Sequence, residues 1–354
     1  MIRAYDSETI RAAEEPLLAA GVPLMREAAR ALAVRVLREL RERGARLPGS
    51  VVLALVGGGN NGGDALYAAA DLARRGLTVH AALCSPAVHP AGLAAARAAG
   101  VRIAPVVAAD RSTDLPLLLD RAARSGIWLD GLAGIGLAGP LREPLAGIVE
   151  ALAAEKAASP DEPVVIAIDV PSGVGDDGAV RGPLLPADVT VTMGAAKPGL
   201  LLPPAAAYAG ELQIVELGLP LAEAEHRVER LDAADVADLY PWPRRADHKY
   251  TRGVLGIWAG SERYPGAAAL CVDGALAAGP GMVRYLGSAP GLTAAHPEAV
   301  TVPGRIQAAV VGSGMDEAAA VRAALDESLA RGVPVVVDAG ALQELGAVLG
   351  LRVD

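Results

Sequence analysis

The segment VVLALVGGGNNGGD, residues 51–64, decides how the first part of this chain folds. Its apolar beginning, Val51–Leu55, predicts a buried strand, and Ala65–Arg75 predicts a helix. A glycine-rich turn between them lets backbone N–H groups approach a phosphate at the positive end of the helix. The glycine spacing matches neither common nucleotide-binding pattern. Two asparagines and Asp64 make the turn specific, and they suit a phosphorylated ligand or a cation. A turn built only for backbone geometry is the alternative.

Strand-like and helical stretches alternate on both sides of this segment. Because the predicted strands are continuous apolar runs, they indicate a parallel sheet with helices on both faces. Ligands of such sheets bind at the carboxyl ends of the strands, where Asp130 and Asp169 also stand. A helix capped by Ser7 and running to about Ala20 is expected first. The further helices are expected at 24–43, 91–99 and 143–157, and the strands at 51–56, 78–83, 127–129, 164–168, 189–193 and 211–217.

Composition excludes several classes of protein. The chain has 354 residues, of which 52% are hydrophobic, so two domains can each bury a core. A net charge of −9 argues against nucleic acid or an anionic membrane as the partner. No apolar run is long enough to predict a membrane span, and no signal segment is expected. With only two cysteines, Cys84 and Cys271, we expect a reducing compartment, the cytoplasm.

A second α/β pattern follows a break in the first. A helical connector is expected at 222–236, and the Pro- and charge-rich segment 240–249 predicts a linker. Beyond it, strands are expected at 254–258, 308–311 and 333–337, with helices at 267–278 and 317–331. We therefore predict a first domain at 1–222, a connector at 223–246 and a second domain at 247–354.

Several segments of the first domain resemble the NAD(P)HX epimerase family. They are GGGNNGGD (57–64), DGLAGIGLAGP (130–140), DVPSG (169–173), ADVTVT (187–192) and KPG (197–199). The resemblance covers roughly residues 1–220. It implies a Rossmann-like, three-layer α/β domain that interconverts the epimers of NADHX and NADPHX, the hydrated nicotinamide cofactors.

The second domain resembles the ribokinase-like, ADP- or ATP-dependent NAD(P)HX dehydratases. The matching segments are HKYTRG (248–253), AGS (259–261), YPGAA (264–268), GPGMV (279–283) and VVVDA (335–339). The downstream Thr-Pro-His, Lys-Gly and Gly-Thr-Gly-Asp segments of that family are not found in this chain. We therefore expect an incomplete domain without dehydratase activity as written, with ADP or ATP as a cofactor only of a complete version.

The resemblance also implies residue roles. Asp169 and Lys197 are expected to move protons, with Asp188 as a weaker catalytic candidate whose alternative is a cap or turn residue. A potassium ion is expected on Asn61, Asp130 and Ser172, because potassium prefers hard oxygen donors. The substrate is expected to contact Asn60, Asn61, Gly62, Gly63, Asp64, Gly134, Ile135, Gly136, Leu137, Ala138, Gly139, Pro140 and Asp169.

Two other functions remain open from the sequence. A domain with these loops could hold an NAD- or ADP-ribose-like ligand, or a protein partner, without turnover. A sugar or vitamin kinase would rest on the second domain alone, and the missing nucleotide loop argues against it. A homo-oligomer is expected in each case.

Overall fold

The computed structural model describes residues 1–134, 139–160 and 162–349. The chain divides into two compact units, Met1–Asp232 and Ala233–Asp354. The division lies inside the segment predicted as a connector. Within the described ranges, no helix combines the length and apolarity needed to cross a membrane.

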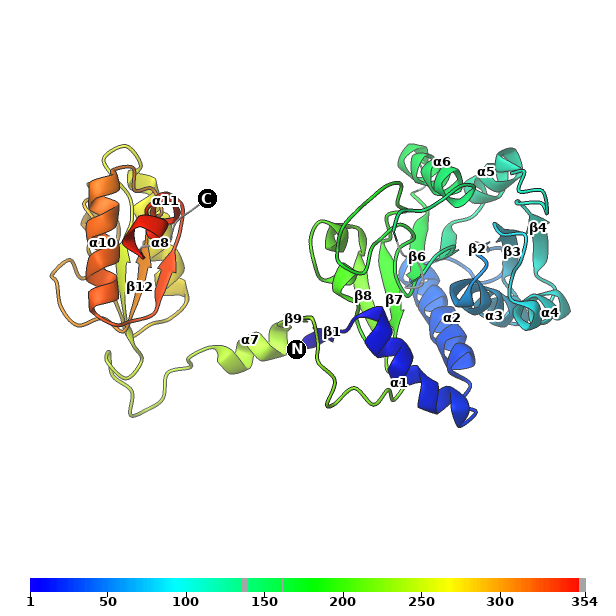
Figure 1. Ribbon diagram of the computed structural model, residues 1–354, viewed down its shortest axis with the longest axis horizontal. Coiled ribbons are helices and arrows are strands. Elements are labelled where there is room, and N and C mark those ends of the chain that lie inside the picture. Colours follow the sequence, from blue (N-terminus) through cyan, green and yellow to red (C-terminus); the bar gives the residue numbers. More distant parts are fainter. Residues whose placement is uncertain (135–138, 161, 350–354) are drawn as a thin grey trace. The chain divides into compact units, whose positions relative to one another are not determined.

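Unit 1 is built on a seven-stranded parallel sheet with the order β4-β3-β2-β5-β6-β7-β8 (Figure 1). The order reverses between β2 and β5, because the chain adds strands outward from this point in both directions. The carboxyl ends of β2 and β5 therefore diverge into a crevice, the usual ligand position of doubly wound sheets. The strands are β2 (Val51–Val56), β3 (Thr78–Leu83), β4 (Arg102–Pro105), β5 (Ile127–Gly131), β6 (Val164–Ile168), β7 (Val189–Met193) and β8 (Glu211–Val215).

Helices cover both faces of this sheet, which confirms the predicted three-layer α/β fold (Figure 1). Alternate residues of β2 divide between two cores, since successive strand residues face opposite sides. Val52, Ala54 and Val56 pack in the core beneath α2 (Leu24–Glu42), α3 (Asn60–Arg74) and α4 (Pro90–Ala98). Leu53 and Leu55 pack in the core beneath α5 (Leu115–Ala123) and α6 (Leu145–Ala158).

The helix after the glycine-rich turn begins earlier than predicted. α3 begins at Asn60 rather than at Ala65, so the Asn-Gly segment forms its first turn. Gly62 permits this, because a Cβ at this position would lie 2.1 Å from the backbone oxygen of Gly57. The close approach brings the positive end of α3 directly onto the end of β2.

The amino-terminal helix α1 (Ser7–Ala19) is capped by Asp6, not by Ser7 as predicted. Asp6 Oδ1 accepts from the backbone N–H of Thr9 at 2.8 Å. Ser7 instead donates twice to Asp176 Oδ2, from its backbone N at 2.9 Å and from its Oγ at 2.7 Å. These bonds fix the start of α1 beside the loop that follows β6.

The predicted helical connector contains a strand. β9 (Val228–Arg230) pairs antiparallel with β1 (Ile2–Ala4), and α7 (Ala233–Leu239) follows it. The sequence analysis did not predict β1 or β9, because a strand of three residues is too short to show the alternation of apolar and polar residues. It also missed β4 and α5.

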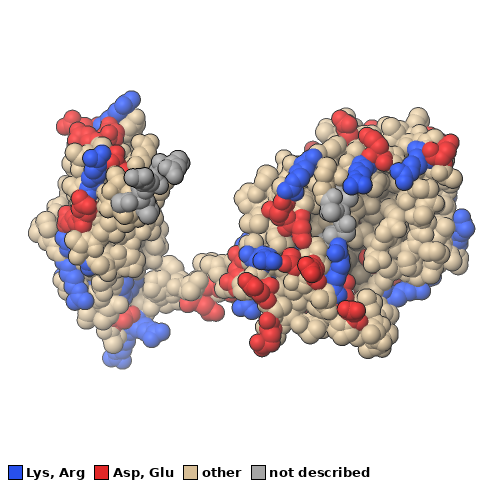
Figure 2. Space-filling view, in the orientation of Figure 1, with Lys and Arg blue, Asp and Glu red and all other residues tan. Residues whose placement is uncertain are grey.

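Unit 2 holds a separate parallel sheet of four strands, in the order β11-β10-β12-β13. The strands are β10 (Val254–Trp258), β11 (Met282–Tyr285), β12 (Ala308–Val311) and β13 (Val335–Val337); the helices are α8 (Pro265–Ala277), α9 (Leu292–Ala295), α10 (Ala318–Ala330) and α11 (Gly340–Val348). On the face shown in Figure 2, acidic and basic side chains are interspersed over both units. On this face, the mixed charges form no broad basic surface that would attract an anionic ligand.

Candidate active site

The loops after β5 and β6 are tied together by Asp130 and Ser172. Ser172 donates to Asp130 twice, from its backbone N at 2.8 Å and from its Oγ at 2.6 Å. Ser172 Oγ also accepts from the backbone N of Ala133 at 3.0 Å. Asp130 and Ser172 are both fully buried, and burial raises the pKa of Asp130 to about 6. The Asp130–Ser172 pair therefore holds the loops after β5 and β6 together at the crevice.

Asn61 bridges from the start of α3 to the end of β6. Its Nδ2 donates to the backbone oxygen of Ile168 at 2.7 Å, which directs Oδ1 away from that strand. Gly134 lies against this amide so closely that a Cβ there would be 2.4 Å from its Oδ1. Asn61, Asp130 and Ser172 thus supply an amide, a carboxylate and a hydroxyl oxygen from three neighbouring segments. This donor set fits a hard monovalent cation such as potassium.

Asp169 and Lys197 form a buried ion pair above the end of β6. Lys197 Nζ donates to Asp169 Oδ1, to Thr192 Oγ1 at 2.9 Å and to the backbone oxygen of Met193 at 2.9 Å. Only 1% of Lys197 and 6% of Asp169 are exposed. Asp169 has a φ of +69°, a left-handed conformation that residues other than glycine rarely adopt. Such strain concentrates at functional sites, where it aims a side chain.

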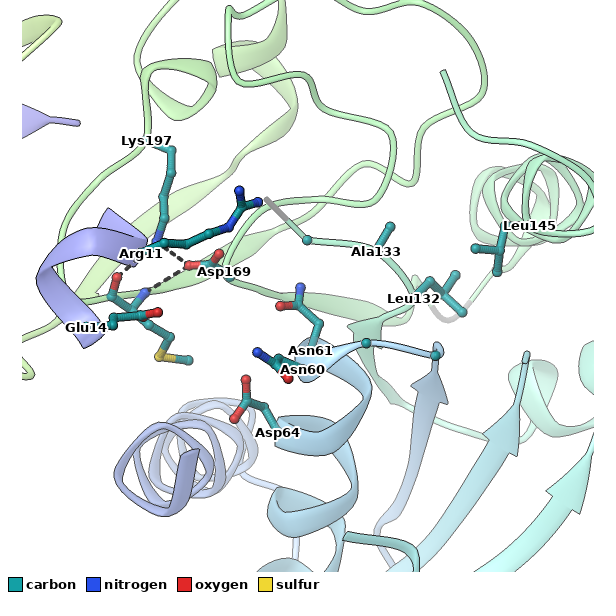
Figure 3. A pocket seen from close by; sticks show the side chains of 14 residues that line it. Arg11, Glu14, Asn60, Asn61, Asp64, Leu132, Ala133, Leu145, Asp169 and Lys197 are labelled. Carbon is teal, nitrogen blue, oxygen red and sulfur yellow. Dashed lines mark hydrogen bonds and ion pairs between the residues drawn. The ribbon is translucent and has the colours of Figure 1, made fainter. Parts of the chain in front are cut away.

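A cavity of about 450 Å³ at the switch point of the sheet is lined by Asn61, Asp169 and Lys197, whereas Asp130 and Ser172 are buried outside its described lining. In Figure 3, α1 contributes Arg11 and Glu14, and α3 contributes Asn60, Asn61 and Asp64, with Asp169 and Lys197 facing them. The described residues that line the cavity are Arg11, Glu14, Gly58, Gly59, Asn60, Asn61, Asp64, Leu132, Ala133, Gly134, Leu145, Asp169, Met193 and Lys197.

Two further carboxyl groups in this cavity are disposed to hold protons. Burial raises the pKa of Asp64 well above its usual value, and the charges of Asp169 and Glu14 add to the effect. Burial also raises the pKa of Glu14. The positive charge of Lys197 opposes this shift, and the negative charge of Asp169 adds to it. Asp64 Oδ1 is buried and has no hydrogen-bond partner among the residues that the structure describes. The cavity therefore combines an ion pair with carboxyl groups whose raised pKa values favour the protonated form.

The sequence analysis did not single out Arg11 or Glu14. They lie one turn apart on α1, among several other charged residues of that helix, so no pattern distinguishes them. The helix reaches the cavity through Ser7 and Asp176, a contact between residues far apart in the chain.

Asp188 lies elsewhere in unit 1. It precedes β7, at the amino ends of the strands, whereas Asp169 and Lys197 follow the carboxyl ends of β6 and β7. Its Oδ2 accepts from Lys156 Nζ at 2.6 Å and from the backbone N of Val165 at 2.8 Å. The catalytic prediction for Asp188 is therefore not supported by its position, and its contacts are those of the alternative, a structural turn residue.

The predicted substrate contacts divide into four groups. Asn60, Asn61, Asp64, Gly134 and Asp169 line the cavity. Gly62 and Gly63 are buried inside α3, where they allow close packing and do not line the cavity. Gly139 and Pro140 are exposed and are not among the described residues that line the cavity. The predictions for Ile135, Gly136, Leu137 and Ala138 fall outside the described residues.

Fold and site together define a doubly wound α/β protein with a carboxylate-rich cavity at its switch point. Comparison with known proteins identifies the family within this class. The family described as YjeF-related protein N-terminus matches residues 21–199, and the family described as NAD(P)H-hydrate dehydratase matches residues 255–348. The chain belongs to the family of NAD(P)H-hydrate repair enzymes.

Individual relatives agree with this assignment. A bifunctional NAD(P)H-hydrate repair enzyme from Mycobacterium tuberculosis is 44% identical over 352 residues, which cover 96% of this chain and 69% of that protein. A similar enzyme from Mycobacterium leprae is 42% identical over 97% of this chain and 69% of its own length. An NAD(P)H-hydrate epimerase from Clavibacter michiganensis is 48% identical over 62% of this chain and 92% of its own length.

Proposed function

We propose that unit 1 interconverts the R and S epimers of NADHX and NADPHX, and that the buried Asp169–Lys197 pair in the switch-point cavity carries the reaction. The ion pair is the observation that supports catalysis over simple binding. Removing a lysine and a carboxylate from water is costly unless the groups are paired, and this pair borders a cavity.

Epimerisation changes the face on which a hydroxyl group is attached to one ring carbon. The C–O bond breaks with its electron pair on oxygen, and the ring nitrogen shares the resulting positive charge. The bond then forms again on the opposite face. The leaving oxygen needs a proton, and the returning water must lose one, so the reaction requires groups that both give and take protons.

The cavity supplies such groups. Asp169 Oδ1 accepts from Lys197, Thr192 and the backbone N of Met193, which leaves Oδ2 to meet the substrate. Its negative charge also stabilises the transient positive charge of the ring. Glu14 and Asp64 approach from α1 and α3 and can exchange protons at the other side of the cavity (Figure 3).

A potassium ion is part of this proposal. Asn61, Asp130 and Ser172 are the residues that would hold it, as the oxygen donors of three adjacent segments. A bound cation supplies positive charge that orders the loops and offsets the burial of Asp130. Proton transfer remains with the side chains of the cavity.

The decisive test is a turnover assay. An NADHX preparation enriched in one epimer is incubated with the purified chain, and the two epimers are separated and quantified with time. We expect rapid approach to the equilibrium ratio, far faster than without protein. Tight binding of NADHX with no acceleration would favour the alternative, a non-catalytic protein that binds NAD- or ADP-ribose-like ligands.

The remaining predictions from the sequence stay predictions. They are the domain boundaries, dehydratase inactivity of this chain as written, its location in the cytoplasm, its homo-oligomeric state and the absence of a nucleic-acid partner. Adding ADP or ATP to the same assay and following the loss of NADHX tests the dehydratase prediction directly.

A further inference from the structure

A second cavity adjoins the proposed active site over the ends of β2 and β3. It has a volume of about 660 Å³ and shares Gly58 and Leu145 with the first cavity. Cys84 and Ser85, which follow β3, line its opposite side. None of its other lining residues belongs to the machinery described above, so its ligand is unassigned.

Two arginines, Arg111 and Arg142, line this second cavity. Both are exposed, and neither forms an ion pair within the ranges that the structure describes. Arg111 has a φ of +67°, and its backbone N donates to Ala108 at 2.9 Å, so a tight turn presents it. Glu143 is the acidic member of the described lining, and its carboxylate accepts from the backbone N of Gly147 at 3.3 Å. The lining therefore carries a net positive charge.

The first cavity is lined by groups of both signs. Its described lining carries the carboxyl groups of Glu14, Asp64 and Asp169 against the cations Arg11 and Lys197. The amino terminus of the 15-residue helix α3 lies between the cavities, with Gly58 in both linings. The helix dipole therefore adds positive potential where the two cavities meet.

The spacing of the strands suits a dinucleotide. β3 and β6 are separated by β2 and β5, so their ends lie about 14 Å apart at the usual distance between neighbouring strands. A dinucleotide can span this distance, so one substrate can react at Asp169 and still reach the loop after β3.

We propose that the cavity lined by Arg111 and Arg142 binds the adenosine half of the substrate through its phosphate oxygens. This inference rests on the proposed epimerase function. Guanidinium groups bind phosphate through paired, charge-assisted hydrogen bonds, and two of them can hold either the pyrophosphate or the additional ribose phosphate of NADPHX.

The test uses the full chain and the variants Arg111→Ala, Arg142→Ala and the double variant. Arg97→Ala, an exposed arginine on α4, is the matched control. Calorimetry measures the affinity for two probes, ADP-ribose and its 2′-phosphorylated form. We expect each single variant to weaken binding about tenfold and the double variant to weaken it further, with Arg97→Ala unchanged. Weakening confined to the phosphorylated probe assigns the ribose phosphate, and weakening of both assigns the pyrophosphate.

A kinetic arm uses the hydrated mononucleotide, which lacks the adenosine half. The double variant should epimerise it at the wild-type rate and lose kcat/KM only on the dinucleotides. The inference is overturned if both probes bind all variants within twofold of wild type, if wild type binds neither, or if the mononucleotide reaction slows equally. Arginine-dependent probe binding without any turnover by wild type would instead refute the epimerase function and leave this ligand site standing.

Discussion

Lys197 donates to the same oxygen of Asp169 that accepts from Thr192 and from the backbone of Met193. Three donors therefore fix one oxygen of this cavity-lining carboxylate. Lysine and carboxylate are buried together, and the removal of either leaves an unpaired group. Asp169→Asn and Lys197→Met are each expected to lower kcat for epimerisation at least 100-fold, on the order expected for loss of a general acid or base. Normal rates in both variants would disprove the proposed mechanism.

The buried Asp64 should make stability depend on pH. Because its pKa is raised in the folded chain, the folded state binds more protons than the unfolded state above about pH 4, the usual value for aspartate. Stability is therefore expected to fall as pH rises from about 4 through the raised pKa. Asp64→Asn removes this titration and should unfold at a higher temperature than wild type at pH 7. Calorimetry should show the difference shrinking toward pH 4; a constant difference would contradict it.

Potassium should stabilise the folded chain through Asn61, Asp130 and Ser172. A ligand that binds only the folded state raises its stability by mass action. We expect the thermal midpoint to rise with potassium chloride and not with choline chloride at equal ionic strength. Asn61→Ala should abolish the rise, whereas Asn60→Ala, the neighbouring amide outside the proposed ion site, should retain it. Equal responses to the two salts in wild type would rule against the site.

The close approach of Gly62 to Gly57 predicts a large effect from a single methyl group. A Cβ at residue 62 would lie 2.1 Å from a backbone oxygen, so the start of α3 must move. Gly62→Ala is expected to reduce the free energy of unfolding by about 1–3 kcal/mol. Gly126→Ala, where a Cβ meets no atom within 4 Å, is the control and should change it by less than about 0.5 kcal/mol. Denaturant unfolding measures both.

The contact between Ser7 and Asp176 should affect catalysis through α1. It holds the helix that brings Arg11 and Glu14 to the cavity. Asp176→Ala is expected to lower kcat/KM on the order of tenfold, because small displacements of a cavity wall cost productive geometry. Asp177→Ala, an exposed neighbour, should have little effect. Equal activity of the two variants would show that α1 is held by other contacts.

Much of the fold could be predicted because its strands are uninterrupted apolar runs. The expected ranges of β2, β3, β6, β7, β10 and β12 agree with the structure to the residue. The start of α3 could not be predicted, since helix formation through Gly62 and Gly63 depends on the surface beneath them.

Site residues that directly follow strands could be predicted from the sequence. Site residues that reach the cavity only through contacts between distant parts of the chain could not. Asp130 and Asp169 stand at strand ends, so the parallel sheet alone placed them on one edge. Asp188 also adjoins a strand, but at its beginning, and this difference puts it on the opposite edge. Glu14 joins the cavity only because α1 folds back over it, which no local pattern in the sequence reports.

The pairing of β1 with β9 has a consequence for how the protein is made. Ala4 also bridges to Ala196, but Ile2 pairs with Arg230, so the first strand of unit 1 completes its pairing only after nearly all of that unit has left the ribosome. The sheet can form earlier, from strands close together in the chain, but the start of α1 is held by contacts of Ser7 with Asp176 and of Asp6 with Arg227, which can form only late in synthesis. During synthesis the nascent chain should therefore form its hydrophobic core before α1 completes the lining of the cavity, and catalytic activity should appear last.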